Sequence, residues 1–353
     1  MKLILLSFLI STMGFCCSTF QLKSDQGPLI GKSFDWDKGH GFVVVNRRHL
    51  SKTAVNIFPD EKKSAVWPEK QGSKYGSITY NQHGIEFPLS GMNEKGLVVE
   101  ILWLDESIVS EIDDRASINE LQWIQYQLDN FATVSEMLTP IEGEKVMPFD
   151  KIRLRNVSAK VHYMVCDAVG ECATIEFLNG KTVVHSGKTL PYKNLTNDTY
   201  QNSLNYLKNF VGFGGEKEIN LKSMESLDRF SRVASLSKSA NSVPGVFKIL
   251  DSVKATGVPH SSVWNLAYEA ANGKAHFRTT ELTDIRTIDL KSLDFSCKNE
   301  PLMLDMEEKL SGDVTHRFTK FDAEKNSKMI RKSVPAILAG VLENYPNSVK
   351  CTD

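Results

Sequence analysis

Short apolar runs separated by turn residues divide much of the chain into candidate β-strands. The strongest is GLVVEILWL at positions 96–104, where nearly every side chain is apolar, as in a strand buried on both faces. Asn179-Gly180 and Asn272-Gly273 predict tight hairpins between successive strands. The other runs that predict strands are 29–34, 42–45, 77–80, 161–168, 172–177, 182–185, 262–269, 274–279 and 285–290.

Apolar residues recurring every three or four positions predict helices between these strands. Ser117 and Glu120 have the spacing of a capping box, and so do Thr133 and Glu136. Further helices are expected over 199–210, 226–236 and 244–253. Helices set between antiparallel hairpins predict an α+β layered fold rather than a doubly wound one. No linker rich in proline, glycine or serine divides the chain, so a single domain is expected over 17–353.

Residues 1–16 have the pattern of a secretory signal peptide. Lys2 is followed by an apolar run over 3–15 that is too short to span a bilayer. Gly14 and Cys16 supply small residues at positions −3 and −1 of a cut after Cys16. We therefore expect export, to the periplasm or the medium, without stable membrane association. The alternative is a lipid-modified cysteine, although the bulky Phe15 fits that signal poorly.

Composition and charge exclude several classes of protein. The 353 residues are 41% hydrophobic and 24% charged, as in a globular protein, and the net charge of −1 with no basic run argues against nucleic-acid binding. No His-x-x-x-His and no Cys/His zinc spacing occurs, so neither a metal nor a cofactor is expected. The segment GPLIGKS at 27–33 is one residue too short for a phosphate-binding loop, and no G-x-S-x-G elbow occurs.

Cleavage after Cys16 leaves cysteines at positions 17, 166, 172, 297 and 351. Cys166 and Cys172 flank a predicted hairpin loop with Gly170 in the left-handed position, so they face each other across the strands. Cys297 and Cys351 lie in late, loop-like sequence and form the second candidate pair. Cys17 is then the cysteine without a partner. The alternative is that all five are reduced, buried residues.

An N-terminal Cys17 carries a thiol and a free α-amine on one residue. An amine with a pKa near ~7.7 can accept the proton of a thiol whose ordinary pKa is about 8.5. This pairing makes Cys17 a nucleophile that brings its own base. The sequence therefore points to an N-terminal-nucleophile enzyme.

Several segments, in order, resemble the choloylglycine hydrolase and penicillin V acylase family. They are Cys17 with the following DQG, GKSFDW at 31–36, GMNEKGLVVEILWL at 91–104, LTN at 195–197, SLDRFSR at 226–232 and AHFRTTELTDIRTIDLKSLDF at 275–295. The family consists of N-terminal-nucleophile hydrolases that cut linear amide C–N bonds. The resemblance covers nearly all of 17–353 and implies a four-layer αββα sandwich and a small-molecule N-acyl amide as substrate.

The resemblance also implies a set of catalytic residues. Cys17 matches the nucleophile and Asp35 the acid that holds its amine and thiol. Asn197 matches the asparagine whose amide lies in the oxyanion hole, and Trp103 the position whose backbone N–H is the second donor and whose ring borders the substrate pocket. Arg229 matches a cation near the nucleophile. Lys32 stands where the family usually has arginine, so it keeps the charge but loses the planar fork.

Some alternatives stay open at this stage. The chain is one residue shorter than typical bile salt hydrolases between Cys17 and Asp35, a difference that we place in the Pro28-Leu29 turn. Trp103 resembles the branch associated with penicillin V and N-acyl homoserine lactones; conjugated bile salts are the alternative substrates. Lys32 also allows a catalytically silent, exported binding protein on the same fold. Asn93 is expected to hold a turn. The sequence allows a homo-oligomer but contains nothing that requires one.

Overall fold

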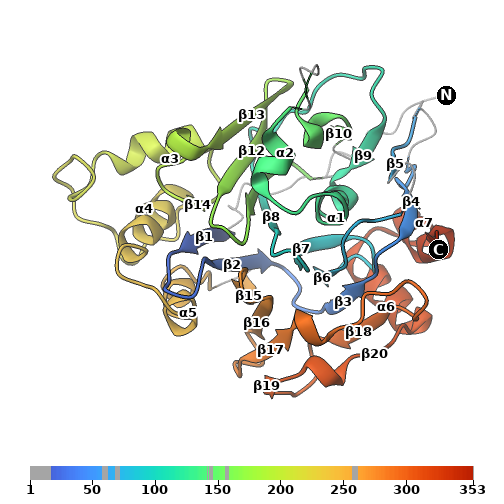
Figure 1. The fold of residues 1–353 in the computed structure, drawn as a ribbon. Coiled ribbons are helices and arrows are strands. Elements are labelled where there is room, and N and C mark those ends of the chain that lie inside the picture. The colour runs from blue at the N-terminus through green and yellow to red at the C-terminus, as the bar shows by residue number, and fades with distance from the viewer. Residues whose placement is uncertain are drawn as a thin grey trace.

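The computed structural model describes residues 17–57, 63–67, 72–140, 142, 146–155, 159–256 and 261–352. The predicted signal peptide over 1–16 therefore lies outside the described residues. Two large sheets dominate the fold and pack face to face (Figure 1). Neighbouring strands pair antiparallel in almost every case, as the hairpin signals predict.

We name the two sheets A and B. Sheet A has the order β14 (Asn194–Leu195), β1 (Ser18–Leu22), β2 (Leu29–Trp36), β15 (Ser261–Glu269), β16 (Lys274–Thr279), β17 (Arg286–Asp289), β19 (Gly312–Asp313). Sheet B has the order β13 (Lys181–Ser186), β12 (Cys172–Leu178), β11 (Val161–Cys166), β8 (Val98–Trp103), β7 (Pro88–Asn93), β6 (Ser77–Asn81), β3 (Phe42–Asn46), β18 (Leu302–Asp305), β20 (Thr319–Lys320). Smaller pairings join β9 (Ser117–Asn119) to β10 (Arg153–Arg155), and β4 (Leu50–Thr53) to β5 (Val66–Trp67) and β21 (Lys350–Cys351).

Helices cover the outer faces of both sheets. The α-helices are α1 (Glu120–Asn130), α2 (Val134–Leu138), α3 (Tyr200–Leu207), α4 (Ser226–Leu236), α5 (Val243–Ser252), α6 (Ala323–Ser333) and α7 (Ala336–Asn344). Short 3₁₀ turns lie at η1 (Pro148–Asp150), η2 (Gly187–Thr189), η3 (Leu290–Ser292), η4 (Thr315–Arg317) and η5 (Tyr345–Ser348). Helix α1 packs on β7 and β8 of sheet B, whereas α4 and α5 pack on β1, β2, β14 and β15 of sheet A. The fold is the four-layer αββα sandwich that the family resemblance implies, and it agrees with the α+β layered fold that the sequence pattern predicts.

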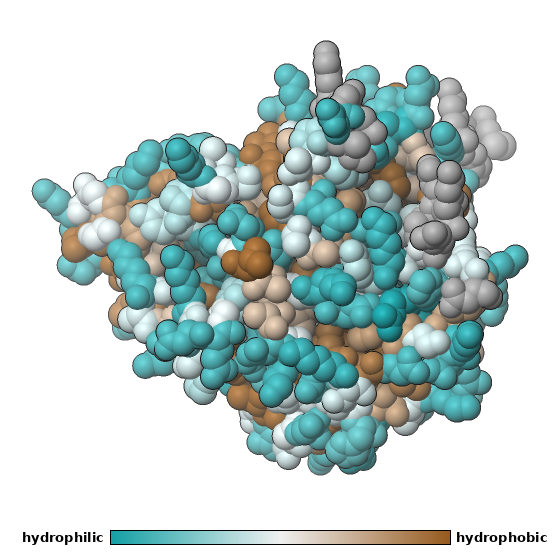
Figure 2. Space-filling model, viewed as in Figure 1, coloured by the Kyte–Doolittle hydropathy of each residue, from teal (hydrophilic) through white to brown (hydrophobic). Residues whose placement is uncertain are grey.

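The interface between the sheets holds aromatic and polar side chains. The Tyr80 ring of sheet B meets the edges of Tyr268 and Phe277 of sheet A, with centroids 6.2 and 5.7 Å apart. Tyr80 is fully buried there, so it is a core residue. On the outside, Figure 2 shows a largely hydrophilic face in which hydrophobic residues form small separate groups.

One predicted helix start is wrong. Ser117 is not the N-cap of α1, because β9 takes residues 117–119 into a parallel pairing with β10. The Ser117 N–H donates to Lys63 O, and Asn119 caps the helix instead by accepting from the Leu121 N–H at 3.1 Å. The second predicted box marks the start of α2 correctly, since Thr133 accepts from the Glu136 N–H.

Turns and disulfides follow the sequence more closely. Asn179 and Gly180 have positive φ angles of 52° and 74°, as a tight hairpin requires. Asn93 holds its turn by accepting from the Lys95 and Leu97 N–H groups. Both candidate cysteine pairs, Cys166–Cys172 and Cys297–Cys351, are disulfides. Among the described residues, no helix combines the length and apolar character needed to cross a membrane.

Candidate active site

Cys17 lies immediately before β1, whose neighbours are β14 and β2. It is the one free cysteine of the described chain, and it is only 4% exposed. Its Sγ lies 3.9 Å from the backbone oxygen of Asp35, near the end of β2, and both residues lie at the open end of the β1–β2 hairpin. The fold therefore holds a single buried thiol beside the predicted acidic residue.

Asp35 is a buried carboxyl group held by serines. Ser33 Oγ donates to Asp35 Oδ1 at 2.6 Å, and Ser262 of β15 lies 3.1 Å from the same Ser33 oxygen. Burial raises the pKa of Asp35, while the hydrogen bonds from Ser262 and Ser33 and the charges of Arg229 and Lys32 oppose that rise. Asp35 Oδ2 is buried without a hydrogen-bond donor in the described residues. An added donor beside Cys17 would find an acceptor there.

Lys32 of β2 is completely buried between the sheets. Its Nζ crosses from sheet A to sheet B and donates to the backbone oxygen of Ile101 in β8. Burial raises the pKa of the Cys17 thiol, and the positive charge of Lys32 is the largest influence that lowers it. Lys32 thus does at the thiol what an arginine would do electrostatically, although its single ammonium group makes no bidentate contact.

Arg229 of α4 connects Cys17 to Asn197. Its Nη1 donates to the backbone oxygen of Cys17 at 2.6 Å and to Ser18 Oγ at 2.7 Å, and its Nη2 donates to Asn197 Oδ1 at 2.8 Å. The side chain is fully buried, which its position on an amphipathic helix does not reveal. Arg229 therefore orients the Asn197 amide with its oxygen toward the guanidinium and its nitrogen away from it.

The Asn197 nitrogen points to the end of β8. Asn197 Nδ2 donates to the backbone oxygen of Trp103 at 2.9 Å. The Leu104 N–H donates to Lys160 O, and N–H groups alternate sides along an antiparallel strand, so the Trp103 N–H faces away from β11. The N–H and C=O of one strand residue point the same way, so the Trp103 N–H lies on the side occupied by the Asn197 amide. The Trp103 indole is half-buried and donates to Asp105 Oδ1 at 2.7 Å.

The structure thus gathers all six predicted residues at one place, where β1, β2, β8, β14 and α4 meet. Sequence reasoning missed several of their partners. Ser262 and Ser18 carry no local signal, because their contacts come from distant segments. Glu100 did carry a signal in the sequence, because it is the only charged residue of the apolar run over 96–104. Burial raises its pKa to about 7, and it accepts from Ser90 Oγ at 2.6 Å.

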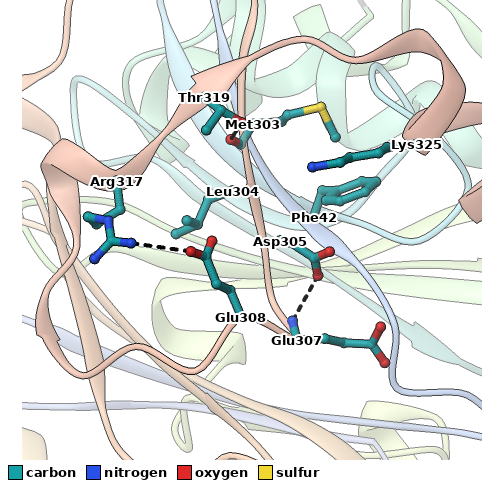
Figure 3. Close-up of a pocket in the computed structure, with 9 residues that line it drawn as sticks. All are labelled: Phe42, Met303, Leu304, Asp305, Glu307, Glu308, Arg317, Thr319 and Lys325. Carbon is teal, nitrogen blue, oxygen red and sulfur yellow. Dashed lines mark hydrogen bonds and ion pairs between the residues drawn. The ribbon is translucent and has the colours of Figure 1, made fainter.

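Figure 3 shows a separate hollow, which has a volume of about 340 Å³. Its lining comes from β3, β18 and the segment that follows, with Glu308 paired to Arg317 at 3.3 Å. Four strand spacings separate β18 from β8 in sheet B, roughly 19 Å. The hollow therefore contributes nothing to the chemistry around Cys17. The described residues also hold no group of three His, Cys, Asp or Glu side chains placed to bind a metal ion.

Comparisons with known proteins agree with the family resemblance. Residues 16–303 match the sequence profile of the linear amide C-N hydrolases, choloylglycine hydrolase family. A penicillin V acylase of Pectobacterium atrosepticum is 29% identical over 255 residues, which cover 67% of this chain and 64% of that protein. The match thus spans less than two thirds of the relative's length.

Two solved structures share the fold. Penicillin V acylase from Agrobacterium tumefaciens has a TM-score of 0.72 at 24% identity, covering 87% of this chain and 98% of its own. A variant of conjugated bile acid hydrolase from Clostridium perfringens has a TM-score of 0.67 at 19% identity, covering 84% of this chain and 98% of its own. The C-terminal part with β20, α6 and α7 lies beyond the family match.

Proposed function

This chain belongs to the choloylglycine hydrolase family of linear amide C-N hydrolases, and on that premise we propose that it is an exported amidohydrolase whose nucleophile is Cys17, freed by removal of residues 1–16. One observation carries the proposal. Cys17 carries the buried free thiol, and its backbone oxygen is connected through Arg229 to Asn197, and through Asn197 to Trp103, by hydrogen bonds of 2.6 to 2.9 Å. A nucleophile and two oxyanion donors need that arrangement.

In the proposed reaction, the α-amine of Cys17 takes the proton from Sγ as the sulfur attacks the amide carbonyl. The carbonyl oxygen becomes an oxyanion, and Asn197 Nδ2 and the Trp103 N–H stabilise it. The C–N bond then breaks, and the ammonium gives its proton to the leaving nitrogen. Water then attacks the thioester as the amine takes a proton from it. The C–S bond breaks, and the amine returns that proton to the sulfur as the thiol leaves. One oxyanion donor of this kind is typically worth about 3 kcal/mol.

The remaining residues orient these groups. Asp35 Oδ2 has no donor among the described residues, and the amine released at Cys17 would supply one. Arg229 fixes both the Cys17 carbonyl and the Asn197 amide, so it sets the distance from nucleophile to oxyanion hole. Lys32 favours the thiolate by its charge.

We further propose N-acyl compounds as substrates, with penicillin V and N-acyl homoserine lactones ahead of conjugated bile salts. The half-buried Trp103 indole beside the oxyanion donors favours an apolar or aromatic acyl group. The relatives supply the leading compounds, since one is named penicillin V acylase and another conjugated bile acid hydrolase. A panel of amides differing only in the acyl group tests this ranking by kcat/KM.

The decisive experiment compares two chains that differ only before Cys17. In one, the initiator methionine is removed, so Cys17 is the first residue. In the other, an added alanine precedes Cys17 and blocks its amine while leaving the thiol. The first is expected to hydrolyse the substrates and to show a thioester by intact mass, and the second to do neither. Equal activity of the two chains contradicts the mechanism.

A silent binding protein on the same fold is the second candidate, and the replacement of arginine by Lys32 is the feature that favours it. The two candidates differ in the reactivity of Cys17. An amidohydrolase reacts with iodoacetamide faster at Cys17 than a free cysteine does, whereas a silent protein with a buried, unactivated thiol reacts more slowly. The site of export is tested by the intact mass of the mature protein, which begins at Cys17 if residues 1–16 are removed and no lipid is added.

A further inference from the structure

A buried histidine outside the six predicted residues contacts Thr196, the neighbour of the proposed oxyanion donor Asn197. We call Thr196 and Asn197 the oxyanion segment. His162 of β11 and Glu176 of β12 are both completely buried and lie on neighbouring strands of sheet B. His162 Nδ1 lies 3.2 Å from Glu176 Oε1, and His162 Nε2 lies 2.8 Å from the backbone oxygen of Thr196. Thr196 directly precedes Asn197. The histidine therefore connects sheet B to the chain segment that carries the proposed oxyanion amide.

Each ring nitrogen of His162 makes a hydrogen bond. The peptide oxygen of Thr196 only accepts, so Nε2–H donates to it, and Nδ1 is bonded to the Glu176 carboxyl group. Glu176 is itself held in place. Its Oε1 also accepts from the Tyr200 N–H at 2.9 Å, which fixes the carboxylate against the start of α3. A ring held at both nitrogens has no rotational freedom left.

The strand that carries His162 also pairs with the strand that carries the other proposed donor. In the register of β8 with β11, His162 pairs with Leu102 and Val161 pairs with Trp103, so His162 is one position along β11 from the residue opposite Trp103. The His162 ring thus connects the β8–β11 pair to the residue before Asn197. On its other side, the oxyanion segment is held by α4, because the Asn197 N–H donates to Ser226 Oγ at 2.8 Å. The two attachments together fix where Asn197 stands relative to β8.

We propose that His162, held by Glu176, is a positioning residue that sets the separation between Asn197 Nδ2 and the Trp103 N–H. The inference rests on the proposed function, because it assigns His162 a role only if those two groups bind the oxyanion. His162 touches no reacting atom in this scheme. It acts through Asn197, and its loss displaces the donor without removing it.

The test replaces the ring with one that makes no hydrogen bonds. His162→Phe is expected to lower kcat roughly 10- to 100-fold, less than the 10²- to 10³-fold that follows removal of a whole oxyanion donor. KM is expected to stay within about threefold, and alkylation of Cys17 by iodoacetamide, which forms no oxyanion, to keep its rate. His162→Gln, which keeps a donor toward Thr196 O, is expected to recover part of the kcat and serves if the Phe variant does not fold.

A double-mutant cycle separates positioning from general damage. In an Asn197→Ala background, His162→Phe is expected to cost less than about threefold further. An undiminished loss in that background overturns the inference, as does an unchanged kcat in His162→Phe. Full activity of Asn197→Ala alone shows instead that the proposed oxyanion hole is wrong.

His276 provides a matched control. It is a buried histidine of β16 that likewise pairs with a glutamate, with its Nε2 2.8 Å from Glu269 Oε1, and its Nδ1 contacts Thr287 rather than the oxyanion segment. His276→Phe is expected to lower stability as His162→Phe does but to leave kcat unchanged. An equal kcat loss in both variants overturns the positioning role.

Discussion

Arg229 and Arg232 lie one turn apart on α4, and neither is more than 1% exposed. Their guanidinium groups bond to different parts of the molecule. Arg229 donates to Cys17, Ser18 and Asn197 of the candidate site, whereas Arg232 donates only to the backbone oxygens of Asn220, Ser223 and Ser252 among the bonds described. The same residue type on the same helix thus offers an internal comparison of a site contact with a structural one.

Replacing either arginine by methionine is expected to destabilise the protein by roughly 3 kcal/mol, because several buried acceptors lose a charged donor. Only Arg229→Met is expected to lower kcat as well, by about 100-fold or more, since it releases the Asn197 amide. Urea unfolding and turnover measured on both variants check this. A similar kcat loss in Arg232→Met means that activity follows stability and not the site contact.

Lys32→Met is expected to raise the pKa of the Cys17 thiol, because the largest influence that lowers it disappears. A rise of one unit lowers the thiolate fraction near neutral pH by about tenfold, and with it the rate of alkylation by iodoacetamide. The pH dependence of that rate, measured by mass spectrometry, gives the shift directly. Lys95→Met removes the same charge from an exposed position and serves as the control.

Glu100 makes stability depend on pH in a direction opposite to that of most carboxylates. Its pKa rises from 4.5 to about 7 in the folded protein, chiefly through burial, while Lys32 and the hydroxyls of Ser90 and Tyr268 oppose the rise. The folded state therefore binds more protons than the unfolded state between these values. Stability from this group is complete below pH 4.5 and is lost as the pH rises toward 7, by about 3 kcal/mol at most.

Glu100→Gln removes that dependence. The unfolding free energy of the variant relative to the parent is expected to increase between about pH 4.5 and about pH 7.5, whatever its absolute value at either end. Urea unfolding of both proteins at about pH 5 and about pH 7.5 provides the four values needed. A difference that stays constant or falls between the two pH values contradicts the assignment.

The two disulfides are expected to differ in their contribution to stability. Cys297–Cys351 closes a separation of 54 residues and Cys166–Cys172 one of 6, so loop entropy predicts about 4 and about 2 kcal/mol respectively. Paired serine replacements at each bridge, compared by urea unfolding, check the order. The 297/351 pair is also expected to leave kcat unchanged, because β21 joins β4, outside the two large sheets that carry the site. A reversed order would show that strain or residual structure outweighs loop length.

Sequence pattern predicted helices α1 to α5 and most of the long strands of both sheets, but it missed β1, β7 and β18 and the helices α6 and α7. The strand STFQL buries Ser18 and Thr19, whose hydroxyls bond to Arg229 and to Gly31 O. The polar residues of such a strand are buried because distant segments supply their hydrogen-bond partners, so the pattern of apolar residues does not predict the strand. The sequence pattern missed helix α6 for a similar reason. Few of its residues are apolar, and only Asn326, Met329 and Ile330 are buried.

The candidate site was predictable as a set of residues but not as a geometry. Cys17, Lys32 and Asp35 lie close together in the sequence, and one hairpin brings them together. The orientation of Asn197 depends instead on Arg229, Trp103 and His162, which come from three other elements. Those contacts appear only when both sheets and α4 are assembled, so no local spacing contains them.

The first strand of sheet A has one more consequence. Chain ends ordinarily fray, and a terminal residue samples many orientations. Here β1 is paired along both edges, with Thr19 opposite Leu195 on one side and Lys32 on the other, and Cys17 directly precedes it. If cleavage makes Cys17 the first residue, the protein gains a chain end that is already immobile. Cys17 is ordered once, during folding, so substrate binding does not have to order the nucleophile in each turnover.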